Sequence, residues 1–264
     1  MSNKLTPKKK EIYIIYPQAQ ISWLNSGEPF SEQFQDFYFS TDGGYQETEY
    51  VFLKPNQFPE RFYLQHNSSS AATISIGETG FGTGLNFLVT LYYWLQIPTA
   101  KHTVHFISTE KYPFTKIQLQ KVYQTFSSHW PQLTELCELL LSFYPDVFNN
   151  KRTFTCQFAH DNFKLTLLTG DACEQLNILA ASKTVIFDAW YLDGFAPSKN
   201  ADMWSQKLFN VIYKLSKTGT TLSSFTAAGF VRRGLIESGF RIKKIPGLGK
   251  KREILTGFYP LNIA

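Results

Sequence analysis

The sequence lacks the features of an exported or membrane-embedded protein. No apolar run reaches the roughly 18 residues that cross a bilayer, and the lysines near its start are not followed by the apolar stretch of an export signal. Cysteine is scarce, because only Cys137, Cys156 and Cys173 occur in 264 residues, and their spacing fits no disulfide framework. We therefore expect a cytoplasmic protein with reduced, buried thiols.

Repeats, low-complexity linkers and clusters of metal ligands are absent as well. His102 and His105 lie three residues apart on an expected strand, so their side chains face opposite sides. The other histidines have no cysteine or acidic partner at ligand spacing, so we predict no metal site. Without a linker, we expect one core over residues 71–264, with residues 1–70 as an extension packed on it.

The sequence does contain enough apolar material for a large core, and its charge is unevenly distributed. Apolar residues make up 43% and aromatic residues 16% of the chain, as in an ordered globular domain. Residues 211–264 hold ten Lys or Arg and two Asp or Glu, a balance of +8, whereas residues 1–210 hold sixteen and nineteen, a balance of −3. This asymmetry predicts a basic surface facing a polyanion, although charge alone equally allows ordinary solvated strands and helices.

Apolar patterning predicts strands that alternate with helices along most of the chain. The expected strands cover residues 73–78, 103–109, 164–169, 184–192, 220–225, 240–245 and 253–259. Helical spacing of apolar residues occurs at 85–95, within 113–150, at 203–215 and at 229–237. This alternation predicts an α/β fold with a Rossmann-like, mostly parallel, seven-stranded sheet.

An earlier segment is expected to form a β-hairpin. Residues 36–53, DFYFSTDGGYQETEYVFL, contain two strand-like runs on either side of Asp42-Gly43-Gly44. Short glycine turns of this kind connect antiparallel strands. We expect this hairpin to be the main element of the extension and to pack on the core.

The string ETGFGTG at 78–84 joins the first expected core strand to its helix. Glycines at such a turn let the backbone approach a ligand closely. A dinucleotide fingerprint would need a third glycine at position 85, where this chain has Leu85. The order acid-x-Gly-x-Gly-x-Gly instead resembles the first motif of class I S-adenosylmethionine methyltransferases, which implies that fold and that cofactor.

Three acidic residues fall at the ends of successive expected strands. Glu78 suits a ligand that is cationic at its sulfonium and amino groups, Glu110 can accept hydrogen bonds from both ribose hydroxyls, and Asp171 stands where members of that family bind the adenine amine. Each acid alone could be a helix cap or a solvated loop residue, but together they indicate a cofactor site. The predicted cofactor-binding residues are Glu78, Gly80, Phe81, Gly82, Thr83, Gly84, Asn86, Glu110, Lys111, Gly170, Asp171, Ala172 and Asp193.

A second signature follows the fourth expected strand, where Asp193 ends an apolar run in the string LDGFAP. The chain also contains ETGFGTGLNFL, EKYPF, FTAAGFVRRGL and GKKRE, with QFQDFYFS and ETEYVFL near its start. LDGFAP, FTAAGFVRRGL and GKKRE are not general methyltransferase motifs. From about residue 20 to 258 the sequence closely resembles the methyltransferase domain of the bifunctional tRNA 5-methylaminomethyl-2-thiouridine biosynthesis proteins.

That resemblance implies S-adenosylmethionine-dependent methylation of the 5-aminomethyl group on the wobble uridine of the tRNA anticodon loop. Members of the family also carry a C-terminal oxidase that uses FAD and makes the aminomethyl group. This sequence stops at Ala264 with no second glycine fingerprint, so we expect a stand-alone methyltransferase without FAD. Its substrate would then come from a separate FAD-dependent oxidase or another upstream enzyme of wobble-uridine modification.

Asp193 is the candidate catalytic residue, because a carboxylate can hold an N–H of the attacking amine and take its proton; a purely structural Asp193 is the alternative. Asp188, five residues earlier on the strand, points to the opposite face and is given no catalytic part. Trp190 and Tyr191 lie inside the strand and fit core positions at least as well as base stacking. Phe195 lies beyond the strand and is expected to stack on the base. The candidates for tRNA contact are Phe195, Arg232, Arg233, Lys250, Lys251 and Arg252, with Lys243 and Lys244 behind them.

Three other functions compete with this hypothesis. A methyltransferase acting on a small-molecule or protein amine would keep the same fold and cofactor. A Rossmann oxidoreductase is disfavoured by Leu85 and Glu78. A non-catalytic RNA-binding partner of a separate oxidase is disfavoured because a degenerate site should have lost one of its four acids, and Glu78, Glu110, Asp171 and Asp193 are all present.

Overall fold

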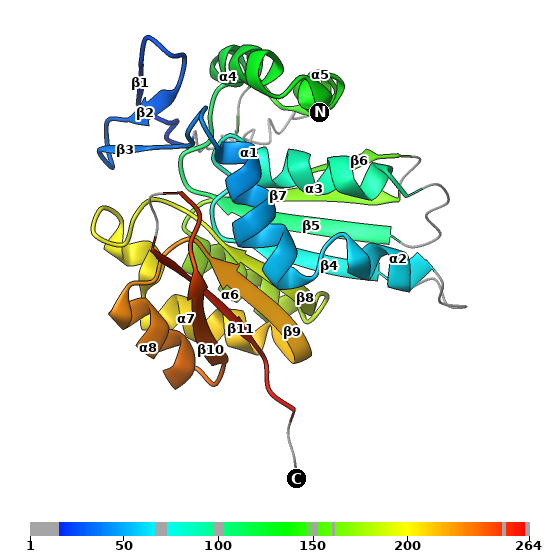
Figure 1. Cartoon of the computed structure of the whole chain (residues 1–264), viewed down its shortest axis with the longest axis vertical. Helices are drawn as coiled ribbons and strands as arrows, with labels where there is room; N and C mark the ends of the chain where they lie inside the picture. The colour runs from blue at the N-terminus through cyan, green and yellow to red at the C-terminus, as the bar shows by residue number, and fades with distance from the viewer. Residues whose placement is uncertain are drawn as a thin grey trace, which may run out of the picture.

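The computed structural model describes residues 16–66, 73–97, 103–146, 148, 153–159, 162–249 and 252–261. Its centre is a sheet with the strand order β10-β11-β9-β8-β4-β5-β7-β6 (Figure 1). Five neighbouring strands are parallel: β4 (Thr73–Glu78), β5 (Thr103–Glu110), β7 (Phe163–Thr169), β8 (Phe187–Leu192) and β9 (Ser216–Ser224). The antiparallel strands at the edges are β6 (Thr153–Phe158), β10 (Arg241–Pro246) and β11 (Glu253–Phe258). The predicted α/β class with a mostly parallel sheet is confirmed.

Helices cover both faces of this sheet and bury two apolar layers (Figure 1). One face carries α6 (Ala172–Ser182), α7 (Gln206–Lys214) and α8 (Gly229–Glu237), with the short helix η4 (Ala201–Trp204) before α7. The other carries α3 (Leu85–Leu95), α4 (Lys116–His129), η3 (Pro131–Leu133) and α5 (Thr134–Phe143). Because the central strands are covered on both sides, β8 is apolar along most of its length, as parallel strands require.

The N-terminal segment does not form the predicted hairpin. The structure has a small antiparallel sheet, but it is formed by β1 (Ile21–Trp23), β2 (Pro29–Ser31) and β3 (Asp36–Phe37). The expected second strand of the hairpin is instead helical, in α1 (Gly44–Glu47), η1 (Thr48–Leu53) and η2 (Lys54–Asn56), followed by α2 (Glu60–His66). A hairpin around Asp42-Gly43-Gly44 was therefore the wrong prediction.

Burial explains the helix. Val51, Phe52 and Leu53 are at most 3% exposed, and a one-sided strand would have turned one of these three consecutive side chains away from the core. Helix η1 is enclosed between α3 and β9, so a wide arc of its surface is buried. Two further elements were missing from the sequence-based expectation, the edge strand β6 and helix α6.

The extension is part of the core and closes one face of the sheet. Asn56 donates hydrogen bonds to Phe52 O at 2.9 Å and to Ser223 Oγ at 2.8 Å, and Arg61 donates to Asp188 O at 3.1 Å. The predicted boundary at residue 70 lies outside the described residues. Within the described part of the chain, no helix is both long and apolar enough to span a bilayer.

Candidate active site

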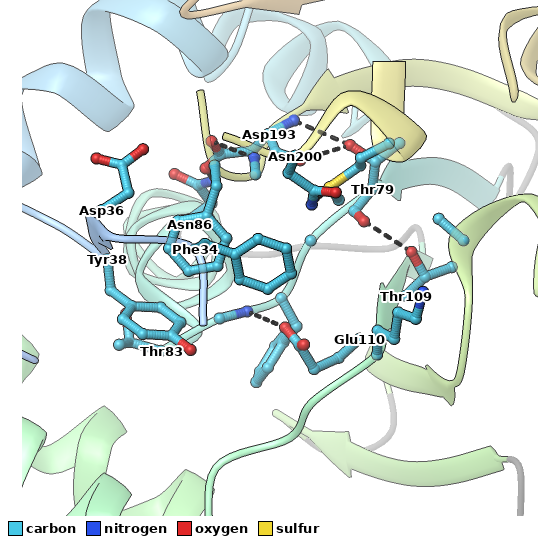
Figure 2. Close-up of a pocket in the computed structure, with 18 of the residues that line it drawn as sticks. Phe34, Asp36, Tyr38, Thr79, Thr83, Asn86, Thr109, Glu110, Asp193 and Asn200 are labelled. Carbon is cyan, nitrogen blue, oxygen red and sulfur yellow. Dashed lines mark hydrogen bonds between the residues drawn. The ribbon is translucent and has the colours of Figure 1, made fainter. Parts of the chain in front are cut away.

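A cavity of about 530 Å³ lies where β4, β5, β7 and β8 end, a volume typical of ligand sites. Figure 2 shows Asp193 and Asn86 on one side of it and Glu110 on another, with Phe34 and Tyr38 reaching in from the N-terminal segment. The carboxyl ends of parallel strands are where α/β sheets bind ligands. Three of the predicted strand-end acids, Glu110, Asp171 and Asp193, are therefore brought together around one cavity.

The glycine turn between β4 and α3 forms one wall of this cavity. Gly84 precedes α3 with φ +77°, a left-handed conformation that a side chain would strain. A Cβ at Gly80 would lie 3.2 Å from the carbonyl oxygen of Asp193. Glycine at position 80 thus lets the turn pack directly against the loop that follows β8.

Glu110 holds the tip of the glycine turn from the end of β5. Its Oε2 accepts a hydrogen bond from Gly82 N at 2.8 Å, and its Oε1 accepts one from Tyr112 N at 2.8 Å. Burial raises the pKa of Glu110 above its ordinary value, and these backbone donors partly oppose that rise. The Glu110 carboxylate lines the cavity, and each of its oxygens can accept more than one hydrogen bond. Two hydroxyl groups of a ligand could therefore donate to it.

Glu78 lies behind the cavity wall rather than on it, at 1% exposure. Its Oε2 accepts a hydrogen bond from Ser108 Oγ at 2.6 Å, and its Oε1 accepts one from Asn86 Nδ2 at 2.9 Å. Burial is the main reason that the pKa of Glu78 rises to about 8, and the nearby Asp193 carboxylate adds to the rise. We therefore expect Glu78 to carry a proton at neutral pH.

Replacing Glu78 with glutamine tests this assignment. In the unfolded chain the carboxyl loses its proton near pH 4.5, but in the folded protein only near pH 8. The resulting stabilisation is complete below pH 4.5 and is lost as the pH rises through about 8. Between pH 5 and pH 9 we expect the free energy of unfolding of the ligand-free protein to fall by about 4 kcal/mol more than that of Glu78→Gln.

Urea denaturation at a series of pH values measures the difference, with Glu138→Gln on the surface of α5 as the control. The two variants should give different pH profiles, because Glu138 is exposed and has no comparable burial. If the wild type and Glu78→Gln lose stability in parallel, Glu78 is ionised in the folded protein.

Asp193, immediately after β8, is held through both its backbone and its side chain. Thr79 Oγ1 donates to the Asp193 carbonyl at 2.7 Å and accepts from the Asp193 amide at 3.0 Å. The Oδ1 atom accepts from Gly194 N at 2.8 Å, and Oδ2 accepts from Asn86 Nδ2 at 2.7 Å. The side chain is half-buried and lines the cavity, so this carboxylate faces a ligand in a fixed orientation.

Asp171 and Lys111 lie at the mouth of the cavity beside β7. Asp171 caps α6, because its Oδ1 accepts hydrogen bonds from Cys173 N and Glu174 N at 3.1 and 3.3 Å. Its Oδ2 lies 3.4 Å from Lys111 Nζ in an exposed ion pair. The helix-cap alternative for Asp171 is therefore realised in the structure, although the residue also lines the cavity together with Gly170 and Ala172.

An aromatic cluster from the N-terminal segment forms the side of the cavity near Asp193. Phe195 stacks on Phe34 with ring centroids 4.6 Å apart and meets Tyr38 edge-on at 4.9 Å. Asp36 Oδ2 accepts a hydrogen bond from Ala196 N at 3.0 Å, which ties β3 to the loop after β8. The sequence analysis gave no role to Phe34, Asp36 or Tyr38. The signal available was the family string QFQDFYFS, which contains all three.

The strand positions around Asp193 have structural roles. Trp190 and Tyr191 are fully buried in the core. Asp188 accepts a hydrogen bond from Ser75 N at 2.8 Å and pairs with Lys217 at 2.7 Å, away from the cavity. Trp190 and Tyr191 therefore occupy core positions, which was one of the two alternatives for them. Asp188 lies away from the cavity wall, which agrees with its lack of a site role.

Comparison with known proteins extends this picture. A family model described as S-adenosyl-L-methionine-dependent methyltransferase matches residues 131–260. The tRNA 5-methylaminomethyl-2-thiouridine biosynthesis bifunctional protein MnmC of Vibrio campbellii is 43% identical over 90% of this chain and 35% of the relative. The MnmC of Pseudomonas aeruginosa is 44% identical over 92% of this chain and 35% of the relative. The crystal structure of MNMC2 from Aquifex aeolicus shares the fold, with a TM-score of 0.68 at 22% identity over 92% of this chain and 71% of that one.

The chain belongs to the S-adenosylmethionine-dependent methyltransferases. It spans about a third of the length of the two MnmC proteins that it resembles. The cavity of this methyltransferase fits a cationic methyl donor, because within the described residues seven acidic side chains and one basic side chain, Lys111, line it. The glycine turn and the Glu110 carboxylate fit the close approach and the ribose hydroxyls of such a cofactor.

The residues predicted to form the site of this methyltransferase divide into four groups. Those on the cavity wall are Gly80, Phe81, Gly82, Thr83, Asn86, Glu110, Lys111, Gly170, Asp171, Ala172, Asp193 and Phe195. Glu78 and Gly84 lie behind the wall, and Arg232, Arg233 and Arg252 lie away from it. Lys250 and Lys251 lie outside the described residues. Among the described residues no group of His, Cys, Asp and Glu could hold a metal ion.

Proposed function

We propose that this methyltransferase transfers the methyl group of S-adenosylmethionine to the 5-aminomethyl group of the wobble uridine in tRNA. The observation that carries the proposal is the Asp193 carboxylate, fixed by two hydrogen bonds beside the aromatic cluster of Phe34, Tyr38 and Phe195. A carboxylate suits an amine, and aromatic rings suit an unpaired base. The similarity to the methyltransferase part of proteins named for 5-methylaminomethyl-2-thiouridine biosynthesis supports this pairing.

The cofactor supplies an electrophilic methyl group, and the protein must present an uncharged nitrogen to it. An alkylammonium has no lone pair, so the site has to bind the neutral amine or remove a proton. Asp193 can do both, because its carboxylate lines the cavity and is held in one orientation by Gly194 N and Asn86 Nδ2. Fixing the amine in line with the methyl group supplies most of the acceleration, since alignment contributes about 7–11 kcal/mol in well-oriented systems.

The tRNA backbone is proposed to contact the basic surface formed by α8 and the β10–β11 hairpin. Arg233 and Arg252 are exposed there, and Arg232 is partly exposed. Lys243 and Lys244 lie on β10, where Lys244 pairs with Glu253 at 2.6 Å. Tyr50 of η1 donates a hydrogen bond to Pro246 O at 2.9 Å, so this hairpin is joined to the segment that lines the cavity.

The reaction can be tested directly on tRNA from a strain that lacks this gene. Purified protein is incubated with that tRNA and a methyl-labelled donor, and the nucleosides are identified by mass spectrometry. We expect label in 5-methylaminomethyl-uridine or its 2-thio form, and no label after RNase treatment of the substrate. Label that persists after RNase treatment, in a cell extract, would favour the alternative acceptor, a small-molecule or protein amine.

The salt dependence of tRNA binding tests the basic surface. Each phosphate contact made to a single strand changes the slope of log affinity against log salt by about 0.7. The double variant Arg232→Ser/Arg233→Ser should therefore bind more weakly and with a shallower slope, while its affinity for S-adenosylhomocysteine stays within twofold. If the slope of the double variant equals that of the wild type, Arg232 and Arg233 do not contact tRNA phosphates.

A further inference from the structure

The side chain of Asn86 connects the carboxyl groups of Asp193 and Glu78 through hydrogen bonds. Its Nδ2 donates to Asp193 Oδ2 at 2.7 Å and to Glu78 Oε1 at 2.9 Å. Its Oδ1 accepts from Thr48 Oγ1 at 2.8 Å. A side-chain amide has two N–H donors and one carbonyl oxygen. Both donors of Asn86 are therefore used inside the protein, and none is left for a cofactor.

Thr48 fixes which way this amide faces. A threonine hydroxyl that donates to Asn86 Oδ1 holds the carbonyl on its own side and turns the NH2 group toward Asp193 and Glu78. The opposite orientation would place the carbonyl oxygen against the Asp193 carboxylate, and Asp193 Oδ2 would lose its hydrogen bond from Asn86, which is costly for a polar group in a buried setting. Thr48 is 2% exposed and Asn86 7% exposed, so water competes little for these contacts.

The side chain of Asp193 depends on this bridge more than its backbone does. Thr79 holds the backbone of Asp193 through two hydrogen bonds that do not involve Asn86. The Oδ2 atom, in contrast, receives its 2.7 Å hydrogen bond from Asn86. A change at Thr48 or Asn86 is therefore expected to reorient the carboxylate while strand β8 and its loop stay in place.

We propose that Asn86 and Thr48 are positioning residues that orient the Asp193 carboxylate for methyl transfer. Asn86 links Asp193 to Glu78 through its two N–H groups, and the Thr48 hydroxyl holds the Asn86 amide in that orientation. This inference rests on the proposed role of Asp193 in the reaction. It gives the N-terminal segment, through helix η1, a part in orienting the Asp193 carboxylate, in addition to the side of the cavity that Phe34 and Tyr38 form.

The experiment compares Thr48→Val, which removes the hydroxyl at constant size, with Thr48→Ser, which keeps it. Thr90→Val is the matched control, because Thr90 is equally buried and its hydroxyl bonds the backbone oxygen of Asn86 and the hydroxyl of Tyr191, not the Asn86 amide. We expect Thr48→Val to lower kcat about tenfold, in line with one lost hydrogen bond. The KM for tRNA and the Kd for S-adenosylhomocysteine should change less than twofold. Thr48→Ser should recover at least half of the wild-type kcat, and Thr90→Val should stay within twofold of it.

Two kinetic outcomes overturn the proposal. One is wild-type kcat in Thr48→Val. The other is a loss of S-adenosylhomocysteine affinity in Thr48→Val or Asn86→Ala that accounts for the whole loss of activity, because Asn86 would then be a cofactor ligand.

A measurement without substrate separates this inference from the proposed function. In the NMR spectrum, the NH2 protons of Asn86, assigned by their loss in Asn86→Ala, should exchange with solvent at least tenfold faster in Thr48→Val than in the wild type. If the wild type methylates no tRNA but shows this difference, the proposed function fails and the bridge stands. Equal exchange rates in the two proteins overturn the bridge whatever the substrate is.

Discussion

Replacing Asp193 with asparagine is expected to lower kcat for tRNA methylation by about 10²–10⁴-fold, the range that proton-transfer groups usually contribute. The asparagine amide can no longer accept a proton. Its NH2 group would also face either Gly194 N or the Asn86 amide, which now donate to the two carboxylate oxygens. Affinity for S-adenosylhomocysteine should stay within threefold, because the backbone of Asp193 remains clamped by Thr79. Single-turnover kinetics and calorimetry measure the two effects separately.

Asp188→Asn is the matched control for this substitution. It makes the same chemical change five residues earlier, on strand β8, where the carboxylate bonds Ser75 N and Lys217 outside the cavity. We expect a modest loss of stability and wild-type kcat. Full turnover by Asp193→Asn would show that this carboxylate has a structural role only.

Replacing Glu110 with glutamine is expected to weaken the binding of S-adenosylmethionine and S-adenosylhomocysteine by about 10–100-fold, since hydrogen bonds to charged groups are worth about 1.5–3 kcal/mol. One carboxylate oxygen accepts from Gly82 N and the other from Tyr112 N. Whichever way the glutamine amide turns, its NH2 group faces one of these two backbone donors. The substitution therefore disturbs the glycine turn and removes the charge that ribose hydroxyls would meet.

Isothermal titration calorimetry with S-adenosylhomocysteine measures this loss without turnover. Glu138→Gln, an exposed position on α5, provides the same chemical change far from the cavity and should bind as the wild type does. Circular dichroism checks that Glu110→Gln is folded. A folded Glu110→Gln with unchanged affinity would exclude Glu110 from cofactor binding.

The side of the cavity built from strand ends could be predicted from the sequence, because its residues directly follow strands. Glu110, Asp171 and Asp193 each come within two residues of the end of a strand, and the ends of parallel strands meet at one edge of a sheet. Leu85, in place of a third glycine, separated a methyltransferase motif from a dinucleotide motif without any coordinates. Which of these acids faces a ligand was not predictable. Glu78 is as close to its strand end as the others, yet it is buried behind the wall.

The side of the cavity formed by the N-terminal segment could not be predicted, because it depends on how that segment packs. Phe34 and Asp36 reach the cavity from a small sheet about 160 residues away in sequence from their partners Phe195 and Ala196. Thr48 reaches Asn86 only because residues 48–53 are helical. Local alternation in that segment favoured a strand, and burial between α3 and β9 decided otherwise.

The sequence by itself determined the class of fold, the order of most strands and helices, the cofactor motif and the family resemblance. All of these rest on local patterns: apolar periodicity, glycine spacing and short strings of residues. The tertiary structure alone decided the helical form of residues 44–56, the burial that raises the pKa of Glu78, and the bridge from Thr48 through Asn86 to Asp193. The physical reason is that burial, desolvation and side-chain hydrogen bonding depend on neighbours from distant parts of the chain, which no local pattern encodes.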